Sequence, residues 1–165
     1  MVLESEVSIL ASLGLSGPTL AALGALVAVA VSGIGSAKGL GISGNAAAGI
    51  TAEQEKNFAM ALVLEALPQT QCVYGFIIGV LIVIGIMGGE MTIEQGWYSL
   101  AAGITVGLAG LSAIDQGKVA AASIGAVAKN ENVKGKVMVF IVMPEIAALF
   151  GFVIAILLLT SGNVL

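Results

Sequence analysis

The chain alternates between long apolar segments and short polar breaks. The apolar segments run approximately Ile9–Leu40, Phe58–Met87, Trp97–Val127 and Val137–Thr160, and the breaks are Thr51–Asn57, Gly88–Gln95 and Lys129–Lys136. Each apolar segment exceeds the roughly 20 residues that an α-helix needs to cross a bilayer. Breaks this short act as turns, so consecutive helices are predicted to be antiparallel neighbours. The pattern therefore predicts an all-α membrane protein: one domain, residues 1–165, with two tandem hairpins, residues 9–87 and 97–160.

Composition supports this interpretation. Hydrophobic residues make up 58% of the chain and charged residues 10%, which is too little polar material to cover a water-soluble domain. An integral, multi-pass membrane protein is therefore expected. The N-terminus, MVLESEVS, is acidic and lacks the basic region of a signal peptide, so the first apolar segment is expected to be retained.

Several classes of function are disfavoured by residues that the chain lacks. It has no histidine and one cysteine, Cys72, so an intrachain disulfide is excluded and a transition-metal site is not expected. Its few lysines form no basic patch, and a nucleic-acid partner is therefore not expected. No glycine-rich phosphate loop precedes a helix, so the chain is not expected to bind or hydrolyse a nucleotide itself.

The lysines predict an orientation in the membrane. All six lie in or near the first and third breaks: Lys38, Lys56, Lys118, Lys129, Lys134 and Lys136. The charged side chains of the second break and of the N-terminus are all acidic. By the positive-inside rule, loops 41–57 and 128–136 are cytoplasmic and both termini face outward.

The two hairpins are copies of each other. An offset of 76 positions pairs Ser36 with Ser112, Gly41 with Gly117, Gly49 with Gly125, Pro68 with Pro144, and Gly75-Phe76 with Gly151-Phe152. The offset needs no gap, and both copies run in the same direction, so the repeat is a parallel one. The first and third apolar segments are rich in small residues that permit close helix contact, whereas the second and fourth carry bulky side chains. Many copies with the small helices inward would form a closed homo-oligomeric ring.

Glu145 is the outstanding polar residue of this apolar chain. It lies within the last apolar segment, directly after Pro144, which is expected to kink the helix. A carboxylate at bilayer depth costs roughly 2.5–3.5 kcal/mol on insertion scales. Two interpretations follow: a protonated, hydrogen-bonded side chain that only joins helices, or a site for an ion or a proton.

Other polar residues favour an ion site. Leu67, Thr70, Gln71 and Tyr74 share one face of the second helix, and Gln116 lies on the third. Counted from the predicted cytoplasmic loops, Gln71, Gln116 and Glu145 all lie roughly 18–21 Å deep, so they can meet at one point. One carboxylate among neutral oxygens suits a small monovalent cation stripped of water, by the logic that governs other hard cations.

The repeat provides an internal control. An offset of 76 replaces Glu145 by Gln69, Thr70 by Ile146, Gln71 by Ala147, Tyr74 by Phe150 and Gln116 by Leu40. Every polar group of the set is lost or neutralised in this equivalent position, which argues for one ion site per four helices.

Three other ionisable features have simpler interpretations. Glu65 faces the depleted equivalent site and is interpreted as a protonated carboxyl, the alternative being a second ion site. Asp115 and Lys118 are expected to pair, because they lie three residues apart on one helix. Lys38 is expected to reach the cytoplasmic headgroups or to bind lipid inside a ring.

The sequence resembles the proteolipid rotor subunit (c or K subunit) of V-type and A-type rotary ATPases. The resemblance covers essentially the whole chain, with two fused hairpins and a carboxylate after Val142-Met143-Pro144. The polar set looks like that of the sodium-dependent members. By resemblance, Leu67 supplies a carbonyl, Thr70, Gln71 and Gln116 supply side-chain oxygens, Glu145 supplies its carboxylate, and Tyr74 closes the site with a hydrogen bond.

The resemblance implies a non-catalytic subunit in a prokaryotic plasma membrane. It would carry Na⁺, or alternatively H⁺ with no bound metal, on Glu145 and would couple ion flow to rotation. The implied partners are copies of itself in a ring, a stator membrane subunit (a/I-type) with a basic residue, central-stalk subunits, membrane lipids and, indirectly, a soluble ATPase head. The alternative is a passive pore or structural oligomer in which Glu145 lines a channel or packs in protonated form.

Overall fold

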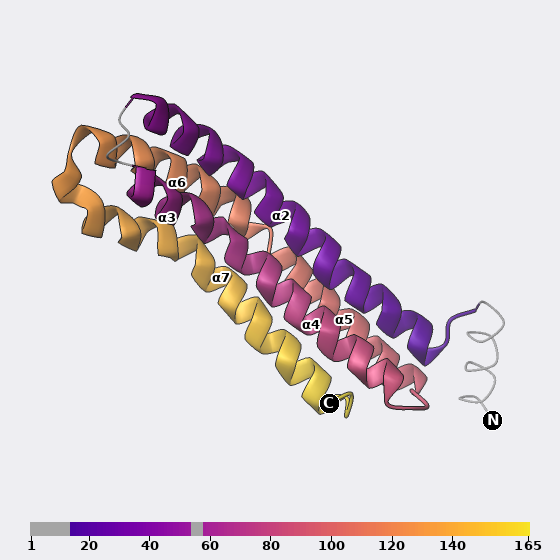
Figure 1. The fold of residues 1–165 in the computed structure, drawn as a ribbon. Helices are drawn as coiled ribbons and strands as arrows, with labels where there is room; N and C mark the ends of the chain where they lie inside the picture. The colour runs from indigo at the N-terminus through magenta and orange to yellow at the C-terminus, as the bar shows by residue number, and fades with distance from the viewer. Residues whose placement is uncertain (1–13, 54–57) are drawn as a thin grey trace.

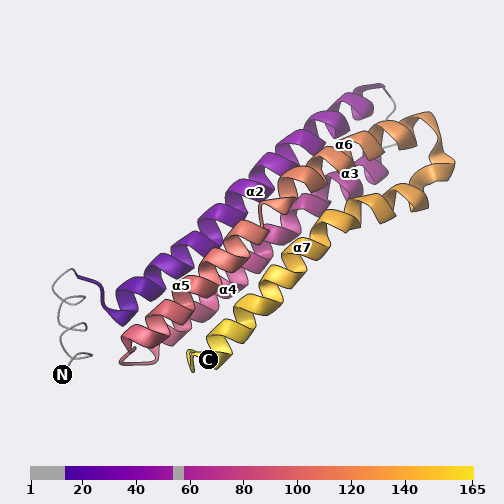
Figure 2. The same ribbon diagram turned by 180° about the vertical axis from the view of Figure 1, so that it is seen from behind.

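The computed structural model describes residues 14–53 and 58–165, and the regular structure within them is helical. The elements are α2 (Gly17–Glu53), α3 (Phe58–Ala66), the 3₁₀ turn η2 (Leu67–Gln69), α4 (Thr70–Met87), α5 (Ile93–Ala109), α6 (Ser112–Lys129), the 3₁₀ turn η3 (Glu131–Val133) and α7 (Lys134–Ser161). They form four spans that are long and apolar enough to cross a membrane. Figures 1 and 2 show these spans as two antiparallel hairpins side by side. The predicted fold class is therefore confirmed.

The helix boundaries follow the internal repeat. The span Gly17–Glu53 and the span Ile93–Lys129 each contain 37 residues, and both ends are displaced by 76 positions. Likewise, α3 begins at Phe58 and α7 begins 76 positions later, at Lys134. The two hairpins thus share one plan for where their helices begin and end.

The first helix continues past the predicted end of its apolar segment. The hydrophobic pattern places that end near Leu40, but the helix runs to Glu53, through a stretch rich in glycine. Glycine has low intrinsic helix propensity, but tertiary contacts override it here. Ser43, for example, is fully buried, and its hydroxyl donates to the Glu65 carbonyl of α3 at 3.1 Å. The predicted beginning of this segment, Ile9, and the Gln54–Asn57 part of the first break lie outside the described residues.

The third span begins earlier than predicted and is interrupted. Thr92 caps α5 reciprocally with Gln95, so the helix begins at Ile93 rather than near Trp97. The chain turns more tightly at Gly110–Leu111, where the Leu111 N–H donates to the Leu108 carbonyl at 3.1 Å. Bonds of this i to i−3 type separate α5 from α6. The sequence around Gly110–Leu111 contains no proline, so it does not predict this break in the helix.

The inner layer brings backbones into direct contact. The helix α2 packs along α5 and α6, with glycines at the closest approaches. A Cβ on Gly103 would collide with the Gly24 carbonyl oxygen, and a Cβ on Gly117 would collide with that of Gly39. Small residues are therefore required along this seam, as the glycine-rich first and third segments predicted.

The outer layer carries the bulky side chains. The elements α3, α4 and α7 hold most of the large apolar side chains that are exposed, including Phe76, Phe140 and Phe150. Pro144 lies inside α7, and the helix changes direction near its middle in Figure 1. Near the inner layer, Lys118 donates to Asp115 at 2.7 Å in an exposed ion pair, which confirms that predicted pairing.

We predict that Gly103→Ala destabilises the bundle. Alanine normally favours a helix by about 1 kcal/mol over glycine. At Gly103, however, the added methyl group must push α2 and α5 apart, and overpacking of this kind costs about 1–3 kcal/mol. Thermal unfolding of the purified chain in detergent measures the effect.

Gly33→Ala is the matched control. Nothing lies within 4 Å of a Cβ placed on Gly33, and its counterpart in the second hairpin, Ala109, already carries the methyl group. This variant should unfold at the original temperature or above. Equal behaviour of the two variants would contradict the close-packing argument.

Candidate functional site

The outer helix of the first hairpin is interrupted next to the polar residues. Pro68 has no backbone N–H, and residues Leu67–Gln69 form a 3₁₀ turn between α3 and α4. The hydroxyl of Thr70, the first residue of α4, donates to the Leu67 carbonyl at 3.1 Å. The Cys72 N–H donates to the Ser36 hydroxyl of α2 at 3.0 Å, which attaches the beginning of α4 to the inner layer.

Glu145 lies opposite this interruption, on α7. The residue is 8% exposed, and both carboxylate oxygens accept hydrogen bonds. The Tyr74 hydroxyl donates to Oε1 at 2.7 Å, and the Gln116 Nε2 donates to Oε2 at 2.9 Å. The Tyr74 ring stacks on Phe152 of α7 with centroids 5.1 Å apart, which holds the hydroxyl in position.

Two fully buried glutamines connect the helices on the other side of Glu145. The Gln71 Nε2 on α4 donates to the Gln116 Oε1 on α6 at 2.6 Å. The Thr70 hydroxyl also faces the Gln71 Oε1 at 3.1 Å. Besides its bond to Glu145, the Gln116 Nε2 faces the Ile141 carbonyl at 3.1 Å. Buried amides are costly unless they are paired, and these contacts satisfy them.

The structure thus joins all the sequence-predicted site residues in one hydrogen-bonded chain: Leu67, Thr70, Gln71, Gln116, Glu145 and Tyr74. Each of the six presents an oxygen with lone pairs; apart from the Tyr74 hydroxyl, which donates to Glu145, these are one carboxylate and four neutral oxygens. No three His, Cys, Asp or Glu side chains gather anywhere in the described ranges. A single carboxylate with neutral oxygens balances one monovalent cation better than a divalent metal.

The repeat-equivalent position is different. Its members on α7, Ile146, Ala147 and Phe150, are apolar and exposed. Glu65 is half-buried on α3 and lines a pocket with the end of α2. It is not part of the hydrogen-bonded chain around Glu145.

Sequence reasoning did not identify two contributors. In the sequence, Ser36 stands out only as the repeat partner of Ser112, although its hydroxyl anchors α4. The Ser112 hydroxyl is buried and has no hydrogen-bond partner among the residues that the structure describes. The Ile141 carbonyl contributes through its backbone, for which its side chain gives no signal. The sequence signal for the role of Ser36 is a hydroxyl side chain within an otherwise glycine-rich helix.

Comparison with known proteins places this geometry in a family. Residues 23–82 and residues 100–158 each match the family described as the C subunit of ATP synthase. The chain is 49% identical to the A-type ATP synthase subunit K of Methanocaldococcus jannaschii over 142 residues, which cover 86% of this chain and 62% of that protein. It therefore spans less than two thirds of that relative.

Two further relatives match over nearly their full length. The V-type sodium ATPase subunit K of Enterococcus hirae is 45% identical over 147 residues, which cover 88% of this chain and 94% of that protein. The 16 kDa proteolipid subunit of the V-type proton ATPase of Homo sapiens is 25% identical over 151 residues, or 88% and 97% of the two chains. The resemblance inferred from the residues is confirmed: the chain belongs to the family of the ATP synthase C subunit, and it contains the family's match twice.

Proposed function

We propose that this chain is the ion-translocating rotor subunit of a rotary ATPase and carries one ion on Glu145. The observation that carries the proposal is the setting of that carboxylate. Within the described ranges, Glu145 is the only buried charged side chain, and donors from α4 and α6 hold both its oxygens. An ionisable side chain within a membrane span is by default a candidate functional site, and transport of an ion or proton is the function that an isolated carboxylate suits.

Sodium is the proposed ion, with a proton as the alternative. The Leu67 carbonyl, the Thr70 hydroxyl and the Gln71 and Gln116 amide oxygens supply the neutral ligands, and Glu145 supplies the charge. A proton needs only the carboxylate, so proton transport would not require the amide oxygens of the two glutamines as ligands. The sodium ATPase relative from Enterococcus hirae supports the same choice.

Translocation requires that the carboxylate move between two aqueous routes. Copies of the chain form a homo-oligomeric ring with α2, α5 and α6 inward and the bulky α3, α4 and α7 facing lipid and a stator subunit. Glu145 takes an ion from one stator route, carries it as a neutral pair through the apolar layer, and releases it to the other. A basic stator residue displaces the ion by competing for the carboxylate.

The remaining partners follow from this arrangement. The lysine-bearing segments 41–57 and 128–136, which connect the two helices of each hairpin and include the last turns of α2, face the cytoplasm of a prokaryotic cell and contact central-stalk subunits, with both chain termini outside. ATP hydrolysis or synthesis belongs to the soluble head, and this subunit is not itself catalytic. A passive pore fits less well, because Glu145 lies on an outer helix and is held by donors rather than lining an open path through the inner layer.

The first prediction for this function concerns dicyclohexylcarbodiimide, which modifies protonated carboxyls in apolar surroundings. Glu145 should be labelled, and Glu145→Gln should abolish both labelling and ATP-driven transport. Because sodium competes with the proton for the carboxylate, sodium should slow labelling at neutral pH. Mass spectrometry of the labelled peptide measures this, and labelling that ignores sodium would reassign the site to protons.

The second prediction concerns the closing hydrogen bond. Tyr74→Phe removes one donor from the carboxylate, which is worth about 1.5–3 kcal/mol for a charged partner. The sodium concentration that half-protects Glu145 should therefore rise roughly 10- to 100-fold. Tyr98→Phe, at the other tyrosine, is the control and should leave protection unchanged. Equal effects of the two variants would deny Tyr74 this role.

The third prediction tests the number of ions per chain. Glu65 lies outside the hydrogen-bonded chain, and the equivalent position contains no other polar set. Glu65→Gln should therefore leave coupled transport within about twofold of the original rate. Complete loss of transport in a normally assembled complex would show that Glu65 also carries an ion.

A further inference from the structure

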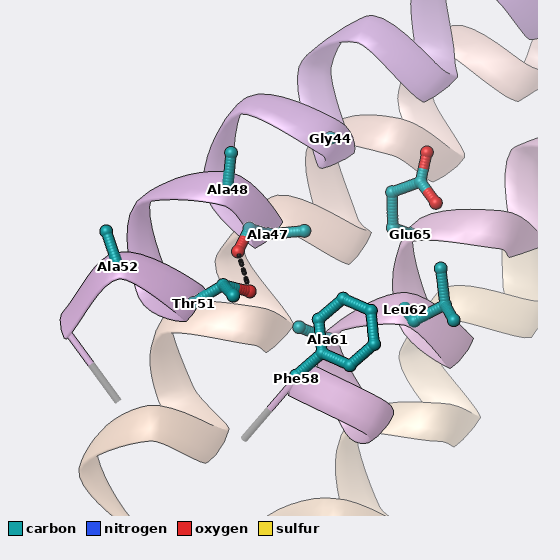
Figure 3. A pocket seen from close by; sticks show the side chains of 9 residues that line it. All are labelled: Gly44, Ala47, Ala48, Thr51, Ala52, Phe58, Ala61, Leu62 and Glu65. Carbon is teal, nitrogen blue, oxygen red and sulfur yellow. Dashed lines mark hydrogen bonds between the residues drawn. The ribbon is translucent and has the colours of Figure 1, made fainter. Parts of the chain in front are cut away.

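A pocket of about 590 Å³ opens between the last turns of α2 and the helix α3. Figure 3 shows its lining, which includes Gly44, Ala48 and Thr51 from α2 and Phe58, Leu62 and Glu65 from α3. The side chains from α2 are small, so α2 and α3 leave space between them. Ala48 is exposed and Glu65 half-buried.

The internal repeat shows what such a pocket accepts. Six of the nine counterparts of its lining, 76 positions later, are buried inside the same chain: Ala120, Ser123, Ile124, Val127, Val137 and Ile141. The other three, Ala128, Lys134 and Met138, are partly buried. Their cover is the outer helix of the first hairpin, because α3 packs against α6 and shares one apolar cluster with it. We call this pocket and its repeat-equivalent region the two seats. The seat of the first hairpin is open, whereas the seat of the second hairpin is filled by α3 of the same chain.

Leu64 of α3 is the residue that fills the second hairpin's seat. It is 0% exposed and lies with Ile124 and Val127 around a gap that has no room for a water molecule. The counterpart of Leu64 is Phe140 on α7, and Phe140 is 63% exposed. The chain thus presents one unfilled seat on its first hairpin and one uncovered bulky side chain on its second.

The same contrast continues along the outer helices. Leu64, Gln71 and Ile78 lie seven residues apart, and each is 0% exposed because the second hairpin covers it. Their counterparts on α7 are Phe140, Ala147 and Ile154, which are all exposed, Ile154 at 48%. A whole face of α7 therefore lacks the cover that its repeat partner has. By the repeat, this face of α7 is equivalent to the face of α3 and α4 that the second hairpin covers within the chain.

The sizes of the side chains are complementary. Where the internal seat has Ala120 and Ile124, the open seat has Gly44 and Ala48, so it is larger. The side chain that would enter the open seat is also larger: Phe140 takes the place of its repeat counterpart Leu64. Close packing favours matched changes of this kind, because both voids and overpacking are destabilising.

We propose that the pocket beside Glu65 is the docking seat for a second copy of this chain, whose Phe140 fills it. The interface within the chain, α3 on α6, is thereby continued between copies as α7 on α2. Gly44, Ala48 and Thr51 form the floor of the seat, and Glu65 takes the place of the buried Ile141. The proposal rests on the ring proposed above and fixes which residues meet between neighbours. It does not depend on Glu145 binding an ion.

Cysteine cross-linking in membranes tests the contact. In a Cys72→Ala background, Phe140→Cys with Ala48→Cys should give a ladder of dimers and higher oligomers with a short thiol-to-thiol cross-linker. The matched control is Leu64→Cys with Ile124→Cys, the repeat-equivalent pair, which should cross-link within one chain and still migrate as a monomer. Each single-cysteine variant should give no ladder.

A size exchange tests the packing itself. Ala48→Ile alone overfills the seat, and the detergent-resistant oligomer should be lost. Adding Phe140→Leu reproduces the internal pair of Leu64 and Ile124, and the oligomer should return. Native mass spectrometry of the purified full chain measures both variants.

The outcomes separate this interface from the proposed function. An intact oligomer without the cross-linked ladder, or an Ala48→Ile variant that assembles normally, would overturn the Phe140 seat and leave the ring standing. Absence of any oligomer would overturn both. A ladder that also forms with Glu145→Gln, where transport is lost, would support the interface independently of ion binding.

Discussion

A carboxylate placed in an apolar layer constrains the structure around it. Glu145 is buried, so the chain must supply hydrogen-bond donors and must hold them in place. Tyr74 and Gln116 supply them at 2.7 and 2.9 Å from two different helices. Each donor is then fixed by a further contact, the tyrosine by Phe152 and the glutamine by Gln71.

This constraint explains the irregular backbone beside the site. Pro68 and the 3₁₀ turn interrupt the helix at the polar cluster, where the Leu67 carbonyl accepts from both the backbone N–H and the hydroxyl of Thr70. Irregular backbone within a membrane is tolerated only where protein satisfies it. Here the Ser36 hydroxyl does so, which ties the site to the glycine-packed inner layer.

The internal repeat produces two equivalent faces between hairpins, and their side chains suit different roles. Within the chain, the first hairpin meets the second across a polar set that suits a cation. At the equivalent face, which we propose to lie between copies, the polar set has been replaced by Leu40, Ile146 and Ala147, and larger apolar groups face smaller ones. In the two proposals, one backbone arrangement serves both ion binding and assembly, because the requirements differ only in side chains.

The sequence by itself determined the membrane class, the four spans, the parallel repeat and the members of the polar set. Hydrophobic length, a gapless offset and helical spacing are local or one-dimensional signals, so they can be read without coordinates. Only the tertiary structure decided the extension of α2 to Glu53, the break at Gly110, the anchoring role of Ser36 and the open seat beside Glu65. Each of these features depends on packing contacts between residues that are distant in sequence, and such contacts override local helix propensity.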